Sequence, residues 1–517
     1  MRSPAAPYEP PEAFNLADYL LDQRVREGRG DRIALRLDDR ELTYREVQGL
    51  ANRFAQVLRQ RGIDREDRVM LALPDGAEFV GALFGVLKLG AVVVMVNPQL
   101  KPEEITALYD YTRVRCVVVH GSVETTFREA WSDDAPRHGF VTVGADDGET
   151  RFEDLAAGLD ETFTNAETHR DDAAIWLFSG GTTGRPKAVI QTHRSFANTT
   201  ELYAKRALGY HEDDVTISVP KLYFGYATGS NLFFPFSVGG SAALFTEHPT
   251  PEVLFAKIAQ HQATILINVP TLINRMVSHP EADPQDLSTL RFATSAGEAL
   301  PIPLYQRWKD TFGVELLDGL GTAEMWHIFV SNLPGAVKPG TLGQVIPGFE
   351  LKVCDDDGRE VADGEVGRLW VRGDSRAIGY WQNMPKTQEA FYGDWFVGGD
   401  LVCRDTEGYV TYCGRSDDVL KVGGKWLVPQ EVESCLMRHP AVKECAVVGA
   451  EDAEGLMKPY AFVTPKDAAA TDLEEQLKAF ALKHLQAYKH PRRVIVLDDF
   501  PRTHLGKINR GKLKGMV

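Results

Sequence analysis

The chain has 517 residues, which at roughly 150 residues per domain leaves room for two to four domains, each able to bury a core. Hydrophobic residues make up 44% and charged residues 25%, a composition too apolar for a disordered chain. The 57 Lys plus Arg against 73 Asp plus Glu give a net charge of −16, which repels nucleic acid and anionic lipid. We therefore expect no nucleic-acid partner and no membrane association.

Cysteine usage and the N-terminal segment bear on the compartment. Six cysteines are too few for a disulfide framework, and none forms a Cys-x-x-Cys pair. The first 14 residues hold four prolines and no apolar segment of signal-peptide length. The most apolar stretch, residues 81–96, is interrupted by Lys88 and by glycines. We expect a protein of the reducing cytoplasm, without an export signal or a membrane span.

The first half of the chain alternates helical and strand patterns. Thr43 and Glu46 form a capping box ahead of apolar residues at helical spacing, and Gly62 ends this amphipathic helix. Apolar or β-branched runs follow at 69–73, 91–96, 116–119, 216–219, 242–245 and 264–268, with helical segments at 79–87 and 251–260. Such alternation is typical of βαβ units around buried parallel strands, so we expect a large α/β domain.

The character of the sequence changes twice in the second half. After about Gly340, glycines punctuate short strands such as 368–371, which predicts a β-rich subdomain. From Gly414 a turn-rich stretch precedes helical patterns at 429–437 and 473–485 and strand patterns from 447 and at 494–497. We predict an α/β fold with an N-terminal domain over residues 1–416 and a small α+β C-terminal domain over residues 417–517.

Residues 179–187 form a loop suited to a polyphosphate. They read Ser-Gly-Gly-Thr-Thr-Gly-Arg-Pro-Lys and directly follow the apolar run 174–178. Glycines let backbone N–H groups approach phosphate oxygens, hydroxyls add donors, and Lys187 adds a positive charge. Pro186 before the lysine and Ala188 after it do not fit the Walker A pattern. The alternative is a flexible Gly/Thr surface loop without a ligand.

With this loop, the sequence resembles the adenylate-forming superfamily of acyl-CoA synthetases, nonribosomal adenylation domains and luciferases, whose signature is a Ser/Thr/Gly loop ending in Pro-Lys. Further matching segments follow in the family's order: Ser-Ala-Gly-Glu at 295–298, Gly-Leu-Gly-Thr-Ala-Glu at 319–324, Leu-Trp-Val-Arg-Gly at 369–373, Gly-Asp at 399–400, Gly-Arg-Ser-Asp-Asp at 414–418 and Gly-Lys at 506–507. The resemblance implies an enzyme that uses ATP, Mg²⁺ and coenzyme A and has a mobile C-terminal domain.

The resemblance also implies roles for individual residues. Those that would bind ATP or AMP are Ser179, Gly180, Gly181, Thr182, Thr183, Gly184, Lys187, Ala296, Gly297, Glu298, Asp318, Gly319, Leu320, Gly321, Thr322, Asp400, Arg415 and Lys507. The implied catalytic residues are Lys507, Thr182, Lys187 and Glu324. Glu324 would hold Mg²⁺ beside the phosphates, where negative charge accumulates, and helix capping is its alternative role.

Three charged residues of the second half take further roles by this resemblance. Asp400 would accept hydrogen bonds from both ribose hydroxyls, and Arg415 would contact the ribose. Lys507 would bridge the attacking carboxylate and the α-phosphate. Outside these motifs, Arg415 would be an ordinary exposed arginine and Lys507 an ordinary surface lysine near the C-terminus.

The thioester-forming step is expected to use the C-terminal domain. Asp417 matches the hinge position, where a few residues absorb the backbone change between two arrangements of that domain. Four residues would then face the active site for thioester formation: Lys421, Gly423, Gly424 and Trp426. A glycine turn without a ligand is the alternative.

Three positions depart from the family's pattern. Ala323 stands where relatives commonly have Thr or Ser, so an α-phosphate contact is lost or shifts to Thr322. Gly399 stands where Thr often precedes the ribose aspartate, and Ala188 replaces a usual Gly after the loop lysine. None of these changes removes a charged participant, so we expect altered constants rather than an inactive enzyme.

Two aromatic-rich segments, 221–229 and 324–328, would flank the acyl pocket. Tyr226 and Trp326 could wall a flat slot, and His327 could distinguish ring substituents. The small residues that would keep the slot narrow are Ala296, Gly297, Gly319 and Gly321. The expected substrate-binding residues are Gly225, Tyr226, Ala227, Ala296, Gly321, Trp326, His327 and Ile328. Aromatic residues more often form core than pocket, which is the alternative.

These segments, in particular Glu-Met-x-His-Ile, are similar to those of benzoate-CoA, anthranilate-CoA and related aryl-CoA ligases. The sequence therefore predicts an AMP-forming ligase for a small aromatic acid: benzoate, anthranilate or a hydroxybenzoate. One alternative is a free-standing aryl-acid adenylating enzyme that loads a carrier protein. Another is a catalytically silent nucleotide-binding protein. The oligomeric state stays open, with a homodimer among the options.

Overall fold

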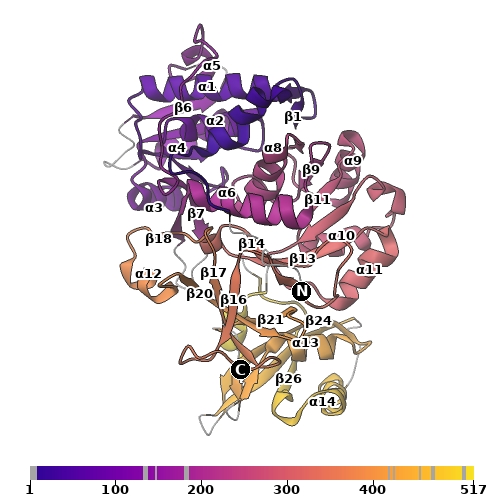
Figure 1. Cartoon of the computed structure of the whole chain (residues 1–517). Coiled ribbons are helices and arrows are strands. Elements are labelled where there is room, and N and C mark those ends of the chain that lie inside the picture. Colours follow the sequence, from indigo (N-terminus) through magenta and orange to yellow (C-terminus); the bar gives the residue numbers. More distant parts are fainter. Residues whose placement is uncertain are drawn as a thin grey trace. The chain divides into compact units, whose positions relative to one another are not determined.

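Figure 1 shows the computed structural model of the chain, which divides into two compact units. The first unit comprises Met1–Glu350 and Val371–Phe396, and the second comprises Leu351–Trp370 and Val397–Val517. The structure describes residues 8–131, 138–145, 148–179, 186–416, 420–422, 425–452, 456–466, 472–502 and 508–517. The predicted α/β class, with a large N-terminal part and a small C-terminal part, is confirmed. The predicted boundary at 416/417 stays a prediction.

A seven-stranded sheet in the first unit has the order β18-β8-β7-β4-β3-β5-β6. Its strands are β3 (Arg68–Ala72), β4 (Val92–Met95), β5 (Cys116–His120), β6 (Phe140–Val143), β7 (Ala173–Ser179), β8 (Lys187–Thr192) and β18 (Gly379–Tyr380). Strands β3 to β7 pair in parallel, whereas β8 runs antiparallel to both β7 and β18. The parallel strands are continuous apolar runs because both of their faces are buried.

A nine-stranded sheet in the same unit has the order β15-β14-β13-β12-β11-β9-β10-β1-β2. Its strands are β1 (Ile33–Arg36), β2 (Glu41–Thr43), β9 (Val215–Ser218), β10 (Ser241–Ala243), β11 (Ile265–Asn268), β12 (Phe292–Ser295), β13 (Leu316–Gly321), β14 (Ile328–Ser331) and β15 (Gln344–Val345). Strands β9, β11, β12 and β13 pair in parallel, so their carboxyl ends meet at one edge of the sheet.

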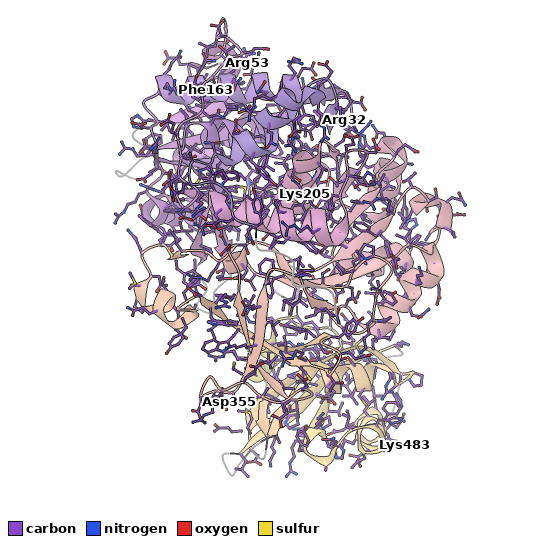
Figure 2. All side chains as sticks on the ribbon, viewed as in Figure 1. Arg32, Arg53, Phe163, Lys205, Asp355 and Lys483 are labelled. Carbon is purple, nitrogen blue, oxygen red and sulfur yellow. The ribbon has the colours of Figure 1, made fainter. Side chains whose placement is uncertain are left out.

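Helices separate the strands of the first unit. They are α1 (Tyr44–Gln60), α2 (Ala77–Lys88), α3 (Pro102–Thr112), α4 (Gly121–Glu129), α5 (Phe152–Leu155), α6 (His193–Thr199), α7 (Gly225–Thr228), α8 (Phe234–Val238), α9 (Pro251–His261), α10 (Pro270–Val277), α11 (Ile302–Phe312) and α12 (Met384–Ala390). Wider π-type turns form η1 (Asp18–Asp22), η2 (Val25–Arg29), η3 (Thr200–Leu208) and η4 (Gly229–Phe233), and 3-10 turns form η5 (Pro284–Leu287) and η6 (Ala323–Met325). Lys205, labelled in Figure 2, lies on η3, where its Nζ pairs with Glu201 at 2.6 Å.

Local signals explain how helix α1 begins. The hydroxyl of Thr43 accepts from the N–H of Glu46 at 3.3 Å, and the carboxylate of Glu46 accepts from the N–H of Thr43 at 2.7 Å. The predicted capping box is therefore present, and it satisfies two N–H groups that the first helical turn leaves free. Both groups lie within four residues of sequence, which is why the pattern could be recognised there.

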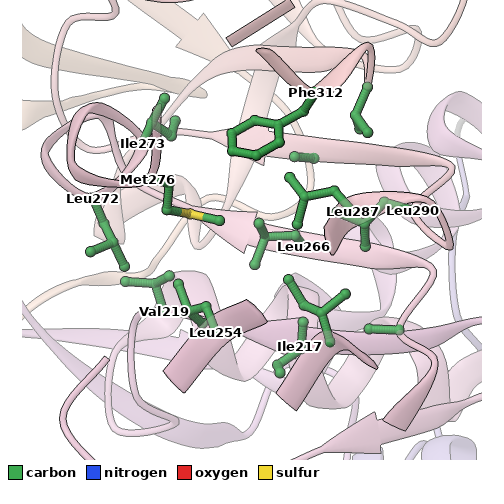
Figure 3. Close-up of a cluster of buried hydrophobic side chains, with 14 of the residues drawn as sticks. Ile217, Val219, Leu254, Leu266, Leu272, Ile273, Met276, Leu287, Leu290 and Phe312 are labelled. Atoms are coloured by element: carbon green, nitrogen blue, oxygen red, sulfur yellow. The ribbon is translucent and has the colours of Figure 1, made fainter. Parts of the chain in front are cut away.

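The core of the nine-stranded sheet lies under helices α9, α10 and α11 (Figure 1). Figure 3 shows apolar side chains from strands β9 and β11 against those of the helices, with Ile217 and Leu266 facing Leu254 and Met276. These four side chains are fully shielded from solvent. Burying each one contributes about 1.5–3 kcal/mol, so this core holds the carboxyl ends of the strands in fixed positions.

The second unit contains strands and three helices in its described residues. Four strands of a five-stranded sheet lie wholly or mostly in it: β16 (Glu350–Cys354), β17 (Val366–Arg372), β20 (Trp395–Arg404) and β21 (Val410–Arg415). The fifth strand, β19 (Phe391–Tyr392), belongs to the first unit, and the chain passes between the units within β17 and β20. The remaining elements are the hairpin β22 (Leu420–Val422) and β23 (Lys425–Leu427), the sheet β24 (Val442–Glu451), β25 (Met457–Pro465) and β26 (Arg493–Val496), the helices α13 (Pro429–Met437), α14 (Leu473–His484) and α15 (Arg510–Lys514), and the turn η7 (Ala487–Lys489). Strand β24 begins at Val442, five residues before the predicted start at 447. The sequence did not indicate these first residues because Lys443 and Glu444 interrupt the apolar pattern of the strand.

Two global expectations can be compared with the structure. All six cysteines, which lie among the described residues, are free thiols. In the part of the chain that the structure describes, no helix has the length and apolar character needed to cross a bilayer.

Candidate active site

A cavity of about 380 Å³ lies in the first unit, where strands of both large sheets end. Strands β4 and β7 of one sheet and β12 and β13 of the other direct their carboxyl ends toward it. The lining residues are Met95, Val96, Asn97, Leu100, Leu108, Leu177, Phe178, Pro186, Tyr223, Phe224, Gly225, Tyr226, Ala296, Gly297, Gly321, Thr322, Ala323, Trp326, His327 and Ile328. The lining is mostly apolar with a few polar groups, as is usual for a small-molecule site.

The structure brings most of the predicted acid-binding residues to this one cavity. Gly225, Tyr226, Ala296, Gly297, Gly321, Trp326, His327 and Ile328 all line it. Ala227 is fully buried and is not among the lining residues. Gly319 also lies outside the lining, and a Cβ there would come within 2.9 Å of the carbonyl oxygen of Val330 on the neighbouring strand. That glycine is required by strand pairing.

Trp326 and His327 form a buried wall of the cavity. Both side chains are 2% exposed, and their rings lie 5.4 Å apart, centre to centre. Trp326 has φ +60°, in the left-handed region that side-chain-bearing residues rarely adopt. This backbone conformation follows the short turn η6 and precedes strand β14. The turn thus presents two adjacent aromatic side chains to one cavity.

The hydrogen bonds of His327 fix its tautomer. Nε2 lies 3.1 Å from the carbonyl oxygen of Tyr226 and 3.1 Å from Oγ of Ser230. A carbonyl can only accept, so Nε2 carries the proton and Nδ1 is left as an acceptor. Burial lowers the pKa of His327 to about 4, so the ring is neutral at physiological pH. Nδ1 has no hydrogen-bond partner among the described residues, and neither does Nε1 of Trp326.

Two glycines leave room for His327. A Cβ on Gly229 would lie 2.4 Å from Cδ2 of His327, and a Cβ on Gly321 would lie 2.5 Å from its carbonyl oxygen. Both distances are far below van der Waals contact. The close approach of these two backbones therefore determines where the imidazole sits, and any larger residue would displace it.

The segment that carries Glu324 is held by four neighbouring groups. The amide of Gln191 donates to the carbonyl of Ala323 at 2.6 Å, and the hydroxyl of Ser375 donates to the carbonyl of Met325 at 2.9 Å. The N–H of Ala377 donates to the carbonyl of Glu324 at 2.7 Å. The fourth group, the hydroxyl of Thr322, accepts from the N–H of Met325 at 3.2 Å and so caps η6. The rigid backbone fixes the direction of the carboxylate.

The carboxylate of Glu324 is connected to the loop lysine through an aromatic ring. Its Oε1 accepts from the hydroxyl of Tyr380 at 2.8 Å, and the side chain is buried. The ammonium of Lys187 lies 5.3 Å from the centre of the Tyr380 ring, within the range of a cation–π contact. Sequence reasoning missed Tyr380, although it follows Gly379 in the strand β18 that pairs with β8.

Asp318 is a buried acid in the middle of β13. Burial raises the pKa of its carboxyl to about 7, although the neighbouring Ser295 hydroxyl and Gly319 N–H favour the charged form. Two other predicted nucleotide residues are also described: Leu320 on β13 is half-buried, and Glu298 accepts from the hydroxyl of Thr271 at 2.8 Å. A carboxyl with a pKa near neutrality is typical of functional sites.

Asp400 and Arg415 are neighbours in the second unit. Antiparallel pairing of β20 and β21 places them opposite each other, and Nη1 of Arg415 lies 3.5 Å from Oδ1 of Asp400. The hydroxyl of Tyr412 lies 3.5 Å from the same oxygen. A Cβ on Gly399 would lie 2.9 Å from Nη2 of Arg415, so the glycine allows the guanidinium to lie over the backbone.

Several predicted residues lie outside the described part of the chain. They are Gly180, Gly181, Thr182, Thr183, Gly184, Asp417, Gly423, Gly424 and Lys507. Ser179 is the last residue of β7 and pairs with Lys187, so these two enclose the phosphate loop. Lys421 and Trp426 lie opposite each other in the backbone of the hairpin β22–β23.

Sequence reasoning missed one wall of the cavity. Met95 ends strand β4, Val96 and Asn97 follow it, and Leu177 and Phe178 are the last residues of strand β7 before Ser179. The sequence predicts residues 91–96 as a strand and 174–178 only as an apolar run, and the ends of such runs carry no distinctive residue pattern. The usable signal was topological, because parallel strands place their carboxyl ends at one edge of the sheet.

Among the described residues, no cluster of three or more His, Cys, Asp or Glu side chains could hold a metal by itself. This arrangement is compatible with Mg²⁺, which is commonly bound by one or two carboxylates together with substrate phosphates and water. Glu324 fits that description, because Tyr380 occupies Oε1 and the other oxygen, Oε2, is the one that could bind the ion.

Comparisons with known proteins agree with this geometry. The AMP-binding enzyme family matches residues 21–381, and the AMP-binding enzyme C-terminal domain matches residues 431–507. A benzoate–CoA ligase of Thauera aromatica is 40% identical over 508 residues, covering 98% of this chain and 96% of that protein. The crystal structure of an anthranilate CoA ligase in complex with anthranoyl-AMP has a TM-score of 0.90 at 36% identity, covering 98% of each chain. A benzoate CoA ligase from Burkholderia xenovorans LB400 has a TM-score of 0.86 at 39% identity, covering 97% of this chain and 100% of the other.

Proposed function

The chain belongs to the AMP-binding enzyme family, and we propose that it is an AMP-forming aryl-CoA ligase that activates a benzoate-like or anthranilate-like acid. The observation that carries this proposal is the position of Tyr226, Trp326 and His327 around one cavity, directly beside the segment of Glu324. The acid-binding site and the proposed phosphate and metal site thus share one stretch of backbone.

The size and lining of the cavity support a small aromatic acid. Its volume of about 380 Å³ lies near the lower end of the usual range of ligand sites, about 300–1,000 Å³. Aromatic side chains favour a planar ring over a flexible chain. Nδ1 of His327, an acceptor, and Nε1 of Trp326, a donor, are buried without a hydrogen-bond partner among the described residues, and both residues line the cavity, which is why amino- and hydroxybenzoates belong in the test beside benzoate.

The first step joins the acid to AMP. The carboxylate of the acid attacks the α-phosphorus of ATP, and pyrophosphate leaves. We propose that Lys187 and the loop that it ends hold the phosphates, while Lys507 stabilises the charge that develops at the α-phosphate. Glu324 would hold Mg²⁺, which supplies positive charge to the phosphate oxygens when bound. Asp400 and Arg415 would contact the ribose, and Asp318 would belong to the nucleotide-binding residues.

The second step transfers the acyl group from AMP to the thiol of coenzyme A, with release of AMP. We propose that the domain containing residues 417–517 changes its arrangement between the steps, with Asp417 as the hinge. The pantetheine arm of coenzyme A would then be bound by Lys421, Gly423, Gly424 and Trp426. Replacement of Asp417 by proline would slow this step and leave adenylation unchanged.

The test is coenzyme-A-dependent AMP release with ATP and Mg²⁺ across benzoate, anthranilate, hydroxybenzoates, cinnamates and fatty acids. One preferred aryl acid with formation of its CoA thioester is the expected result. Adenylate formation without thioester would point instead to a carrier-protein acceptor. The absence of AMP formation with every acid would refute the proposal that the protein is an AMP-forming ligase. We also propose a cytoplasmic location, which the free thiols of the six cysteines support.

A half-reaction assay tests the role of Lys507. Lys507→Ala should lower pyrophosphate release by at least 100-fold, about 2.7 kcal/mol, and leave conversion of supplied aryl-AMP to the thioester unchanged. Lys514→Ala is the matched control, because Lys514 is an exposed lysine on the helix α15 that follows. Equal losses in both half-reactions would refute the assigned role.

A further inference from the structure

The loop after strand β9 supplies a large part of the aromatic wall of the cavity. Tyr223, Phe224, Gly225 and Tyr226 all line it, and the loop continues into the short helix α7. A loop that shapes a binding site must be held in place, because an unconstrained backbone would let the rings move. The contacts of Leu222, just before these rings, show what holds it.

Both backbone polar groups of Leu222 are hydrogen-bonded to side chains. Oδ1 of Asp75 accepts from the Leu222 N–H at 2.8 Å, and the hydroxyl of Thr228 donates to the Leu222 carbonyl at 2.5 Å. The side chain of Leu222 is itself fully buried. Asp75 lies between β3 and α2, 147 residues away along the chain. It therefore connects the seven-stranded-sheet part of the unit to the loop of the other sheet.

The surroundings of Asp75 act on its charge in opposite directions: burial disfavours the carboxylate, whereas neighbouring positive groups favour it. Asp75 is 6% exposed and lies just before the N-terminus of α2, where the helix dipole favours negative charge. Lys221, which is adjacent to Leu222, favours the ionised form, whereas burial raises the pKa of Asp75 to about 6. Lys221 itself donates to the carbonyl of Phe245 at 2.7 Å. At neutral pH the bond to Leu222 is thus a charge-assisted one, which is stronger than a neutral bond.

We propose that Asp75 is a positioning residue for acid binding, an inference that rests on the proposed function. Asp75 holds the Leu222 N–H and so places Tyr223 and Tyr226 against the aryl ring. Asp75 is not among the residues that line the cavity. Its effect on the acid therefore acts through the loop, and the nucleotide should not be affected.

The experiment compares four variants in the full-length enzyme. Asp75→Ala removes the acceptor, Asp75→Asn keeps an oxygen without the charge, and Thr228→Val removes the second bond to Leu222. Asp172→Asn is the control: Asp172 lies just before β7, at the end of that strand away from the cavity, and also accepts from a backbone N–H, that of His169, at 2.8 Å. The readouts are KM for the aryl acid, KM for ATP, kcat, and hydrogen exchange of the peptide covering residues 221–228.

Asp75→Ala should raise KM for the acid about tenfold and leave KM for ATP within about twofold, since a charge-assisted hydrogen bond has a value of this order. Asp75→Asn should raise KM for the acid about threefold, and Thr228→Val should raise it by a similar factor. Both variants should also speed hydrogen exchange in the loop peptide. The control variant should change neither KM for the acid nor the exchange of this peptide. If Asp75→Ala fails to fold, Asp75→Asn and Thr228→Val decide the question.

Two results would overturn the inference: unchanged exchange of the loop peptide in the Asp75 variants, or equal increases of both KM values. Failure of the proposed function gives a different result, namely a wild-type enzyme that forms no aryl-CoA from any acid. The exchange measurement does not depend on activity, so even in that case it tests whether Asp75 holds the loop that contains Leu222.

Discussion

Replacing Asp318 by asparagine should make the protein more stable at neutral and alkaline pH. Asp318 is 8% exposed, and burial raises the pKa of its carboxyl to about 7. Asparagine has nearly the same shape and keeps an oxygen that can face Ser295 and the N–H of Gly319. The substitution therefore removes mainly the cost of ionising a buried acid.

The size and sign of the effect follow from proton linkage. The unfolded chain releases this proton near pH 4, whereas the folded protein keeps it up to about pH 7. Folding takes up a proton between these values, so the free energy of unfolding of the wild type falls as the pH rises through that window. The two pKa values differ by about 3, which at about 1.4 kcal/mol per pH unit gives an upper limit of about 4 kcal/mol.

The assay is urea unfolding of both proteins between pH 5 and 8, followed by tryptophan fluorescence. The stability advantage of Asp318→Asn should grow by about 2–3 kcal/mol over this range and level off above pH 7. Asp310→Asn, on the exposed face of α11, is the control and should show no such growth. A difference between Asp318→Asn and wild type that is independent of pH would refute the reasoning.

Two further predictions concern the cavity and its neighbour. Gly229→Ala places a Cβ 2.4 Å from Cδ2 of His327, so it should push the imidazole into the cavity, cost about 1–3 kcal/mol of stability and raise KM for the acid severalfold. An unchanged acid KM, measured with the ATP concentration saturating, would show that His327 does not limit the cavity. Tyr380→Phe removes the 2.8 Å hydrogen bond to Glu324 and should raise the Mg²⁺ concentration for half-maximal pyrophosphate release about threefold or more. An Mg²⁺ dependence identical to the wild type would contradict the positioning of the carboxylate by Tyr380.

The parts of the fold that could be predicted are those encoded by nearby residues. The capping box of Thr43 and Glu46 spans four residues, and the apolar runs of β3, β4 and β5 each form one continuous stretch. These strands lie where the apolar runs predicted them, because a parallel strand that is buried on both faces requires uninterrupted apolar residues. The early start of β24 at Val442 could not be recognised, because charged residues there occupy positions inside the strand.

In the candidate site, too, the residues that could be predicted are those within a local sequence pattern, and the others could not. Tyr226, Trp326 and His327 could be named because they lie in short aromatic-rich segments whose place at the acid site is implied by the resemblance to the adenylate-forming superfamily. Asp75 and Tyr380 could not, because their partners are 147 and 56 residues away, and a buried aspartate or a tyrosine near a glycine has no local pattern. Their roles depend on which loops meet at the sheet edges, which is a property of the folded chain.

The left-handed backbone of Trp326 has a consequence for how this molecule could be altered. A non-glycine residue at φ +60° with a large side chain costs on the order of 1–3 kcal/mol, and glycine at the same position would remove most of that strain. That strain is smaller than the packing energy of the indole, which is 2% exposed and contacts the rings of Phe196, Phe233 and Phe234, because removing a buried tryptophan side chain costs about 3–5 kcal/mol. Trp326→Gly would therefore relax the backbone, empty one wall of the cavity and still lower the stability, so the aromatic packing around the acid site is also what maintains the strained turn.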